Sequence, residues 1–123
     1  MGIQIMIIEK RKLTELNAAD YNPRKSDKNQ EKHLRESLEK FGFVEPIIFN
    51  KRTNNIVGGH FRVRELKKLG YKEAECVIVD LSIEDEEELN IRLNANTGSW
   101  DNVLLEKWES EQLESWGLDL PID

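Results

Sequence analysis

The sequence predicts an α/β (α+β) fold in which a small mixed sheet carries packed helices. Short runs of β-branched and apolar residues alternate with longer segments whose apolar residues recur at helical spacing. Glycines stand just past the ends of the expected helices, at Gly42, Gly70 and Gly117. The chain has 123 residues, the size of one ordinary domain, so it can bury one modest core.

The first part of the chain predicts a strand, an irregular segment and a helix. Residues 3–8 form a short apolar run that lacks the basic leader and the cleavage site of a signal peptide, so we expect a strand there. Pro23 disfavours a helix before it, and residues 12–25 are expected to be irregular. Apolar residues then recur at helical spacing up to Phe41, with a helix cap at residues 26–27.

The middle of the chain predicts a hairpin followed by a helix. Residues 46–50 and 56–57 are apolar runs, and the polar turn between them predicts an antiparallel pair. The next helix is expected from about His60 to Leu69, because Gly70 stands just past the last periodic residue.

The last part predicts one more strand and two helices. The strand is expected over residues 74–80, where the single cysteine, Cys76, is interpreted as a small buried hydrophobe. Ser82 caps a helix whose first turns carry five consecutive acids, which the helix dipole favours at that end, so they do not indicate a metal site. A loop is expected at residues 94–99, and a final helix over residues 101–116.

The three tryptophans, Trp100, Trp108 and Trp116, follow one another at intervals of eight residues. We interpret them as packing residues of the core, with an interface to a missing neighbour as the alternative. Residues 1–100 are expected to form the main domain. Residues 101–123 are expected to be a helix and tail that pack on this domain or lead to a further segment.

Charge is distributed unevenly along the chain, whose net charge is −6. Residues 1–72 hold 16 Lys/Arg against 9 Asp/Glu, whereas residues 73–123 hold 2 against 15. This asymmetry is compatible with a basic face that meets phosphates and an acidic face that meets a different partner. Solvated acidic helices are the simpler interpretation of the acidic half.

Residues 56–65 carry the strongest functional signal. A β-branched run meets Gly58 and Gly59 and passes directly into a helical pattern with Arg62 in its first turn. Glycine allows a sharp turn and a close approach to a ligand. A helix start offers unpaired N–H groups and a positive dipole end, and arginine adds a planar fork that matches phosphate oxygens. The segment therefore predicts a phosphate site, with a plain glycine turn as the alternative.

The sequence argues against a metal centre and against membrane insertion. His33 and His60 are the only histidines, so no tight ligand spacing for zinc exists, and His33 is expected to be exposed on a charged helix. No apolar run approaches the ~20 residues that span a membrane. We expect no metal and no membrane partner, and a reducing, cytoplasmic setting for the lone cysteine.

The order of these motifs resembles the N-terminal domain of ParB-like proteins, a family that shares its fold with sulfiredoxin. The resemblance covers roughly residues 5–100 and is carried by Asn22-Pro23-Arg24, residues 37–43, Pro46-Ile47-Ile48, residues 57–62 and Leu69-Gly70. The chain is most similar to ParB-like domains of phages and mobile elements, which often stand beside DNA methyltransferases. Gly59-His60-Phe61-Arg62 and residues 93–101 carry this closer resemblance.

The resemblance implies a nucleotide site around the glycine turn. In the chromosome-partitioning members the corresponding segment, Gly-Glu-Arg-Arg-x-Arg, holds the triphosphate of CTP, and Gly59, Arg62 and Arg64 match that pattern. Asn94 and Asn96 are expected to offer amide contacts to the ligand, and an equal alternative is that they only form a turn. The expected binding residues are Gly58, Gly59, His60, Arg62, Arg64, Arg24, Asn94 and Asn96.

Two departures bear on catalysis. His60 stands where the partitioning proteins carry a glutamate that is implicated in nucleotide turnover, so the resemblance implies binding more than hydrolysis. Sulfiredoxin carries Gly-Gly-Cys-His-Arg at this place, and His60 occupies the position of its cysteine. Because Cys76 lies in a different element, sulfiredoxin chemistry is not expected.

The function expected is a ParB-like nucleotide- or nucleic-acid-binding module that acts in DNA modification, partition or regulation. Its expected ligand is a nucleotide, CTP or ATP with Mg²⁺, or DNA without a nucleotide, or both. Two alternatives stay open. One is an enzyme, either a nucleotide triphosphatase or a ParB-like nuclease. The other is an interaction domain that positions a DNA methyltransferase.

Overall fold

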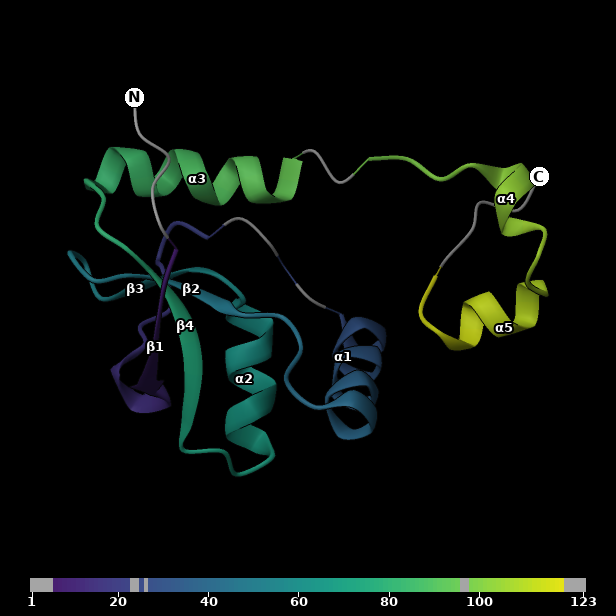
Figure 1. Cartoon of the computed structure of the whole chain (residues 1–123), viewed down its shortest axis with the longest axis horizontal. Helices are drawn as coiled ribbons and strands as arrows, with labels where there is room; N and C mark the ends of the chain where they lie inside the picture. The colour runs from purple at the N-terminus through teal and green to yellow at the C-terminus, as the bar shows by residue number, and fades with distance from the viewer. Residues whose placement is uncertain (1–5, 23–24, 26, 96–97, 119–123) are drawn as a thin grey trace.

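The computed structural model of the chain describes residues 6–22, 25, 27–95 and 98–118. It is a mixed α/β structure, which confirms the predicted fold class (Figure 1). In chain order, its elements are β1 (Ile7–Lys12), η1 (Leu13–Glu15), α1 (Lys28–Phe41), β2 (Ile47–Asn50), β3 (Asn55–Gly58), α2 (His60–Lys68), β4 (Glu73–Val79), α3 (Ile83–Ala95), α4 (Asn102–Leu105) and α5 (Ser110–Ser115).

Within the described residues, the four strands form one sheet in the order β1-β4-β2-β3. β2 and β3 are the predicted antiparallel hairpin, and β1 runs antiparallel to β4. β2 and β4 are parallel, from Ile47 beside Cys76 to Asn50 beside Val79. Parallel neighbours need a crossover connection, and the segment that contains α2 supplies it. This crossover brings the start of α2 directly to the end of β3.

The core lies between the sheet and α1 and α2. Along β4, Ala74, Cys76 and Ile78 are buried and face it, as the period of two in a strand requires. Phe49 of β2 and Leu66 of α2 are almost fully buried against them. Each such side chain contributes roughly 1.5–3 kcal/mol when it leaves water.

Local signals placed the first helix correctly. Asp27 accepts a hydrogen bond from the Gln30 backbone N–H at 2.8 Å, and the Gln30 side chain accepts one from the Asp27 backbone N–H, a capping box. Gly42 follows the helix with a φ of 78°. At the α1–α2 contact, the buried carboxylate of Glu65 pairs with Arg35 at 3.0 Å.

The first strand differs from the prediction. It begins at Ile7 and extends through charged residues to Lys12, and residues 3–5 lie outside the described residues. The charged half belongs to the strand because it pairs with β4, ending at Lys12 beside Glu73. An edge strand leaves side chains in water, so a charged sequence is tolerated there.

The C-terminal region also differs. The prediction of one helix over residues 101–116 is wrong, because the chain forms α4, turns at Trp108, and starts again as α5. Residues eight apart on a straight helix are rotated by about 80°. The break allows Leu105 and Leu113 both to be buried. α3 is longer than expected, since Asn94 belongs to it and not to a loop.

The tryptophans are not core residues, so that interpretation is also wrong. Trp100 is 65% exposed, Trp116 is 58% exposed, and Trp108 is 37% exposed. Cys76, in contrast, is fully buried as predicted, and its burial raises the pKa of the thiol to about 11.

Candidate functional site

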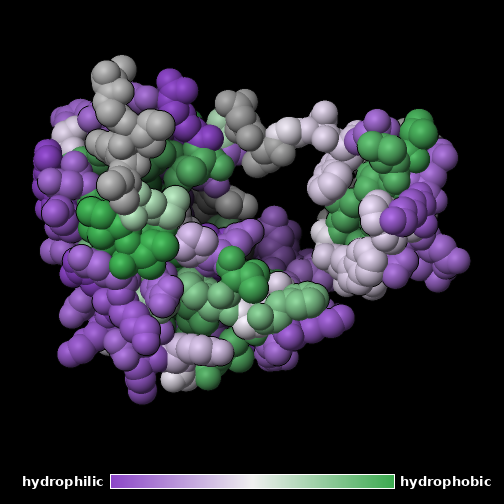
Figure 2. All heavy atoms as spheres, viewed as in Figure 1, coloured by the Kyte–Doolittle hydropathy of each residue, from purple (hydrophilic) through white to green (hydrophobic). Residues whose placement is uncertain are grey.

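A cavity of about 730 Å³ lies where the β2–β3 hairpin leads into α2. Its other walls come from the segment before α1, from α1 itself, from the end of α3 and from the end of α5. Figure 2 shows the molecule hollowed between its main body and the part that carries α4 and α5. Of the residues expected to form the site, the cavity is lined by Gly58, Gly59, His60, Arg62 and Asn94. Arg24 and Asn96 lie outside the described residues.

The two glycines contribute to the turn in different ways. Gly59 caps α2 with a φ of 94°, a left-handed conformation that favours glycine. A Cβ atom on Gly58 would lie 3.4 Å from the side chains of both Ile48 and Leu93, so the hairpin and α3 close in on this position. The turn therefore brings the first N–H groups of α2 to the wall of the cavity, where their dipole favours an anion.

The guanidinium of Arg62 is fixed at the rim of this cavity. Its Nη1 donates to Oε2 of Glu45 at 2.6 Å, and its Nη2 donates to the carbonyl oxygen of Pro46 at 3.1 Å. Glu45 is 69% exposed, so the pair meets solvent on one side. An anion that binds Arg62 must therefore compete with this carboxylate.

Arg64 is directed toward α1, and the described lining of the cavity does not include it. Its Nη1 lies 3.6 Å from Oε1 of Glu31, and its guanidinium carbon lies 5.7 Å from the centre of the Phe61 ring. The structure therefore separates the two arginines that the sequence pattern groups together.

His60 joins two segments of the cavity wall. Its Nε2 accepts a hydrogen bond from the Ala19 backbone N–H at 3.2 Å. Burial lowers the pKa of His60, and the nearby charge of Arg64 lowers it further. A neutral imidazole is required for an acceptor nitrogen, so the hydrogen bond and the pKa agree. The side chain is thus engaged in holding the segment before α1 against the start of α2.

Two amide oxygens in the cavity wall have no hydrogen-bond partner among the described residues. Asn90 of α3 is 1% exposed and donates from Nδ2 to the Val57 carbonyl at 3.0 Å, while its Oδ1 accepts nothing there. Oδ1 of Asn22 is likewise buried and accepts no hydrogen bond among the described residues. A buried polar atom without a partner costs about 1–3 kcal/mol. A ligand with hydrogen-bond donors would remove that cost.

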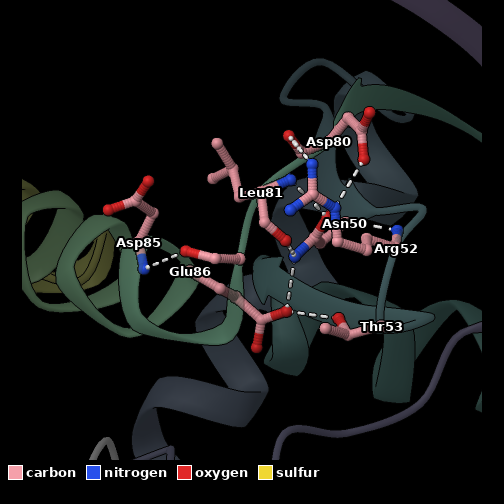
Figure 3. Close-up of polar contacts among 8 residues, drawn as sticks. Asn50, Arg52, Thr53, Asp80, Leu81, Asp85 and Glu86 are labelled. Carbon is pink, nitrogen blue, oxygen red and sulfur yellow. Dashed lines mark hydrogen bonds and ion pairs between the residues drawn. The ribbon is translucent and has the colours of Figure 1, made fainter.

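Asn90 and the buried carboxylate one turn before it were not expected from the sequence. Glu86 is fully buried and accepts from the side chains of Tyr21 at 2.7 Å, Asn50 at 2.8 Å and Asn55 at 3.1 Å. Thr53 also donates to it, and Figure 3 shows this contact beside that of Asn50. Burial opposes the charged form, but the four hydrogen bonds outweigh it and lower the pKa of Glu86.

Glu86 and its four donors form a polar cluster, the Glu86 cluster, which positions the cavity wall. The donors are Tyr21, Asn50, Thr53 and Asn55. The side-chain amide of Asn50 also donates from Nδ2 to the Leu81 carbonyl and accepts at Oδ1 from the Leu81 N–H. The end of β2 is thereby tied to the segment before α3 (Figure 3). The hairpin and the start of α3 are thereby locked together. The available sequence signal was the spacing of four residues between Glu86, Asn90 and Asn94, which places three polar side chains on one face of a helix.

Within the described ranges, no group of three or more His, Cys, Asp or Glu side chains is arranged to hold a metal ion. Among the same residues, none of the helices has the length and apolar character that crossing a membrane requires.

Several solved structures share this fold. One is a C-terminally truncated chromosome-partitioning protein ParB from Caulobacter crescentus, complexed with CTP-gamma-S, with a TM-score of 0.69 at 20% identity. The likeness covers 87% of this chain and 64% of that one. Another is sulfiredoxin from Arabidopsis thaliana, with a TM-score of 0.57 at 22% identity over 68% of this chain and 96% of that one. The architecture is therefore of the ParB and sulfiredoxin type.

The amino-acid sequence assigns the family within this fold. Residues 3–97 match the model of the ParB N-terminal domain, and the chain belongs to that family. The probable chromosome-partitioning protein ParB of Campylobacter jejuni is 32% identical over 72 residues, which are 56% of this chain and 26% of that protein. The chain thus spans about a quarter of the length of this relative.

Proposed function

We propose that this chain is a nucleotide-binding module whose ligand, CTP or another nucleoside triphosphate with Mg²⁺, lies in the cavity beside the start of α2. One observation carries the proposal. The same cavity is lined by a glycine turn at a helix start, by Arg62, and by Asn22 and Asn90 with buried amide oxygens that accept no hydrogen bond among the described residues. The complex of the Caulobacter crescentus relative with CTP-gamma-S supports this choice of ligand.

The phosphates would lie against the backbone of residues 59–62. The helix N-terminus favours negative charge by about 0.3–1 kcal/mol, and more where the site is partly buried. Arg62 would exchange its contact with the Glu45 carboxylate for a phosphate oxygen. Because Glu45 is exposed, it can turn into water at little cost.

The remainder of the nucleotide would meet the amide oxygens of Asn22 and Asn90. Ribose hydroxyls and the exocyclic amino groups of bases are donors, and these oxygens are acceptors. Asn90 is held in place by its own bond to Val57 and by the Glu86 cluster one turn earlier. The Asn90 side chain is therefore preorganised, but its Oδ1 is buried, so the cavity wall must open around this atom before a ligand donor reaches it.

We further propose that the module binds nucleotide without efficient hydrolysis. His60 is engaged with the Ala19 N–H and is held neutral, so it does not replace the carboxylate that the partitioning proteins carry at this position. Its role in DNA modification, partition or regulation, with DNA or a DNA methyltransferase as partner, rests on the sequence resemblance.

The direct test is calorimetric titration of the chain with CTP, ATP and GTP, with and without Mg²⁺, and with duplex DNA. We expect at least one nucleoside triphosphate to bind, and Arg62→Ala to weaken it roughly ten- to a hundredfold, as for loss of a charge-assisted contact. Arg52→Ala is the matched control, because Arg52 also pairs with a carboxylate, Asp80 at 3.0 Å, but does not line the cavity. If no nucleotide binds, or if both variants lose affinity equally, the proposal is wrong.

A further inference from the structure

We propose that the indole of Trp116 forms the wall of the cavity on which the base of the bound nucleotide stacks. This inference rests on the proposed function and deepens it, because it assigns the recognition of the base to the C-terminal part of the chain. It concerns a tryptophan outside residues 3–97, the part that matches the family model.

The first observation is where the chain places Trp116. The end of α5 returns to α1, and the two helices lie near one another in Figure 1. Trp116 and Gly117 consequently line the same cavity as Gly59, Arg62 and Asn90, although more than twenty residues separate them in sequence. The two residues therefore contribute to the lining together with the glycine turn and the end of α3.

The second observation is that this placement is fixed by backbone geometry. The Gly117 N–H bonds to the Glu114 carbonyl at 3.0 Å, and the Leu118 N–H bonds to the Leu113 carbonyl at 3.0 Å. These two bonds form a Schellman motif, with Gly117 at a φ of 97°. The backbone at Trp116, the last residue before that glycine, is thereby fixed beside α1.

The third observation is the close contact with α1. A Cβ atom on Gly117 would lie 3.1 Å from Cγ of His33, so the backbone passes directly over the imidazole. His33 is consequently half-buried and not exposed as the sequence suggested. This contact holds the end of α5 on α1 at the mouth of the cavity.

The fourth observation is the exposure of the indole itself. Trp116 is 58% exposed, which leaves a large aromatic surface available to a ligand. Stacking between an aromatic side chain and a nucleobase does not depend on which base is present, because every base has a π-face. A ligand that offers phosphates to α2, donors to the asparagines and a flat ring to Trp116 is a nucleotide.

The test compares nucleotides with inorganic tripolyphosphate, which has the phosphates but no base. We expect Trp116→Ala to weaken CTP, ATP or GTP by roughly five- to a hundredfold, in line with stacking energies, and to leave tripolyphosphate unchanged. Trp116→Phe should retain part of the affinity. Trp100→Ala is the matched control, because Trp100 is similarly exposed and, like Trp116, lines a second cavity of about 390 Å³, but it does not line the large one.

A fluorescence titration gives a second readout that does not depend on folding losses in the alanine variant. In a chain with Trp100→Phe and Trp108→Phe, Trp116 is the single tryptophan, and we expect nucleotide to quench it while tripolyphosphate does not. The inference is overturned if Trp116→Ala binds nucleotide as the unaltered chain does, or if tripolyphosphate affinity falls in parallel. If the unaltered chain binds tripolyphosphate and nucleotide equally tightly, the phosphate site stands and the stacking role fails. Binding of neither ligand overturns both proposals.

Discussion

Arg62 and Glu45 form a short ion pair at the rim of the cavity, with 2.6 Å between Nη1 and Oε2. Arg62 lies in the first turn of α2, and the carboxylate of its partner Glu45 is largely exposed. Exposed ion pairs of this kind contribute about 0–1 kcal/mol to stability. Their effect on an incoming anion can be larger, because the carboxylate both competes for the guanidinium and repels the ligand.

We therefore predict that Glu45→Gln tightens nucleotide binding severalfold and changes the free energy of unfolding little. The amide removes a negative charge at the rim and frees Arg62 to turn toward phosphate. Parallel titrations of the variant and the unaltered chain check this at low and moderate salt, because the electrostatic part should shrink as salt rises. Unchanged or weaker binding by Glu45→Gln would show that the carboxylate does not compete with the ligand.

A second prediction separates binding from folding. Arg62→Ala should lose affinity while the free energy of unfolding falls by no more than about 1 kcal/mol, because its ion pair lies at the solvent edge. Leu38→Ala should do the reverse, since Leu38 is buried in the core and its truncation costs ~2–5 kcal/mol. Urea unfolding and ligand titration on both variants decide the matter. Unfolding of the Arg62→Ala chain would contradict the assignment of this residue to the ligand.

A third prediction concerns pH. The folded chain lowers the pKa of His60 below its usual 6.5, so the unfolded chain takes up this proton first as the pH falls. Stability should be fully present above pH 6.5 and decline below it, and His60→Gln should remove this part of the decline. Glu86, whose pKa is also lowered, adds a separate loss below its usual value of 4.5. Urea unfolding between pH 8 and about pH 2 measures both, and a stability that rises from pH 7 to pH 5 would contradict the role of His60.

A fourth prediction is that turnover is slow. Phosphate release from CTP or ATP should stay well below the ~1–10³ s⁻¹ of ordinary enzymes, because the imidazole at position 60 is neutral and already bonded to Ala19. A coupled phosphate assay with and without duplex DNA measures it. Turnover in that range would show that another side chain performs the catalysis.

The elements that follow from local chemistry were predictable from the sequence. Asp27 and Gly42 mark the two ends of α1 through contacts within a few residues. The hairpin turn and the glycine just past the end of α2 are equally local features. β1 was misplaced because its charged half becomes a strand only by pairing with β4, more than sixty residues away. Burial of that kind depends on tertiary context, which overrides local propensity.

The site shows the same division. The glycine turn and Arg62 were predicted because the residues that form this part of the site are close together in the sequence. Asn90 and Glu86 were missed because nothing local distinguishes a buried acid from four solvated ones beside it. Their roles depend on Asn50, Thr53 and Asn55 reaching α3 from the hairpin.

An NMR titration of the ¹⁵N-labelled chain with CTP and Mg²⁺ shows whether nucleotide occupies the cavity beside the start of α2. We predict that the backbone amides of residues 58–62, the side-chain amide of Asn90 and the indole N–H of Trp116 shift together with one affinity. The indole of Trp100 should not move with them. Inorganic tripolyphosphate should shift residues 58–62 without Trp116. Saturation by nucleotide with shifts confined to other surfaces, and none at the glycine turn, would contradict the account.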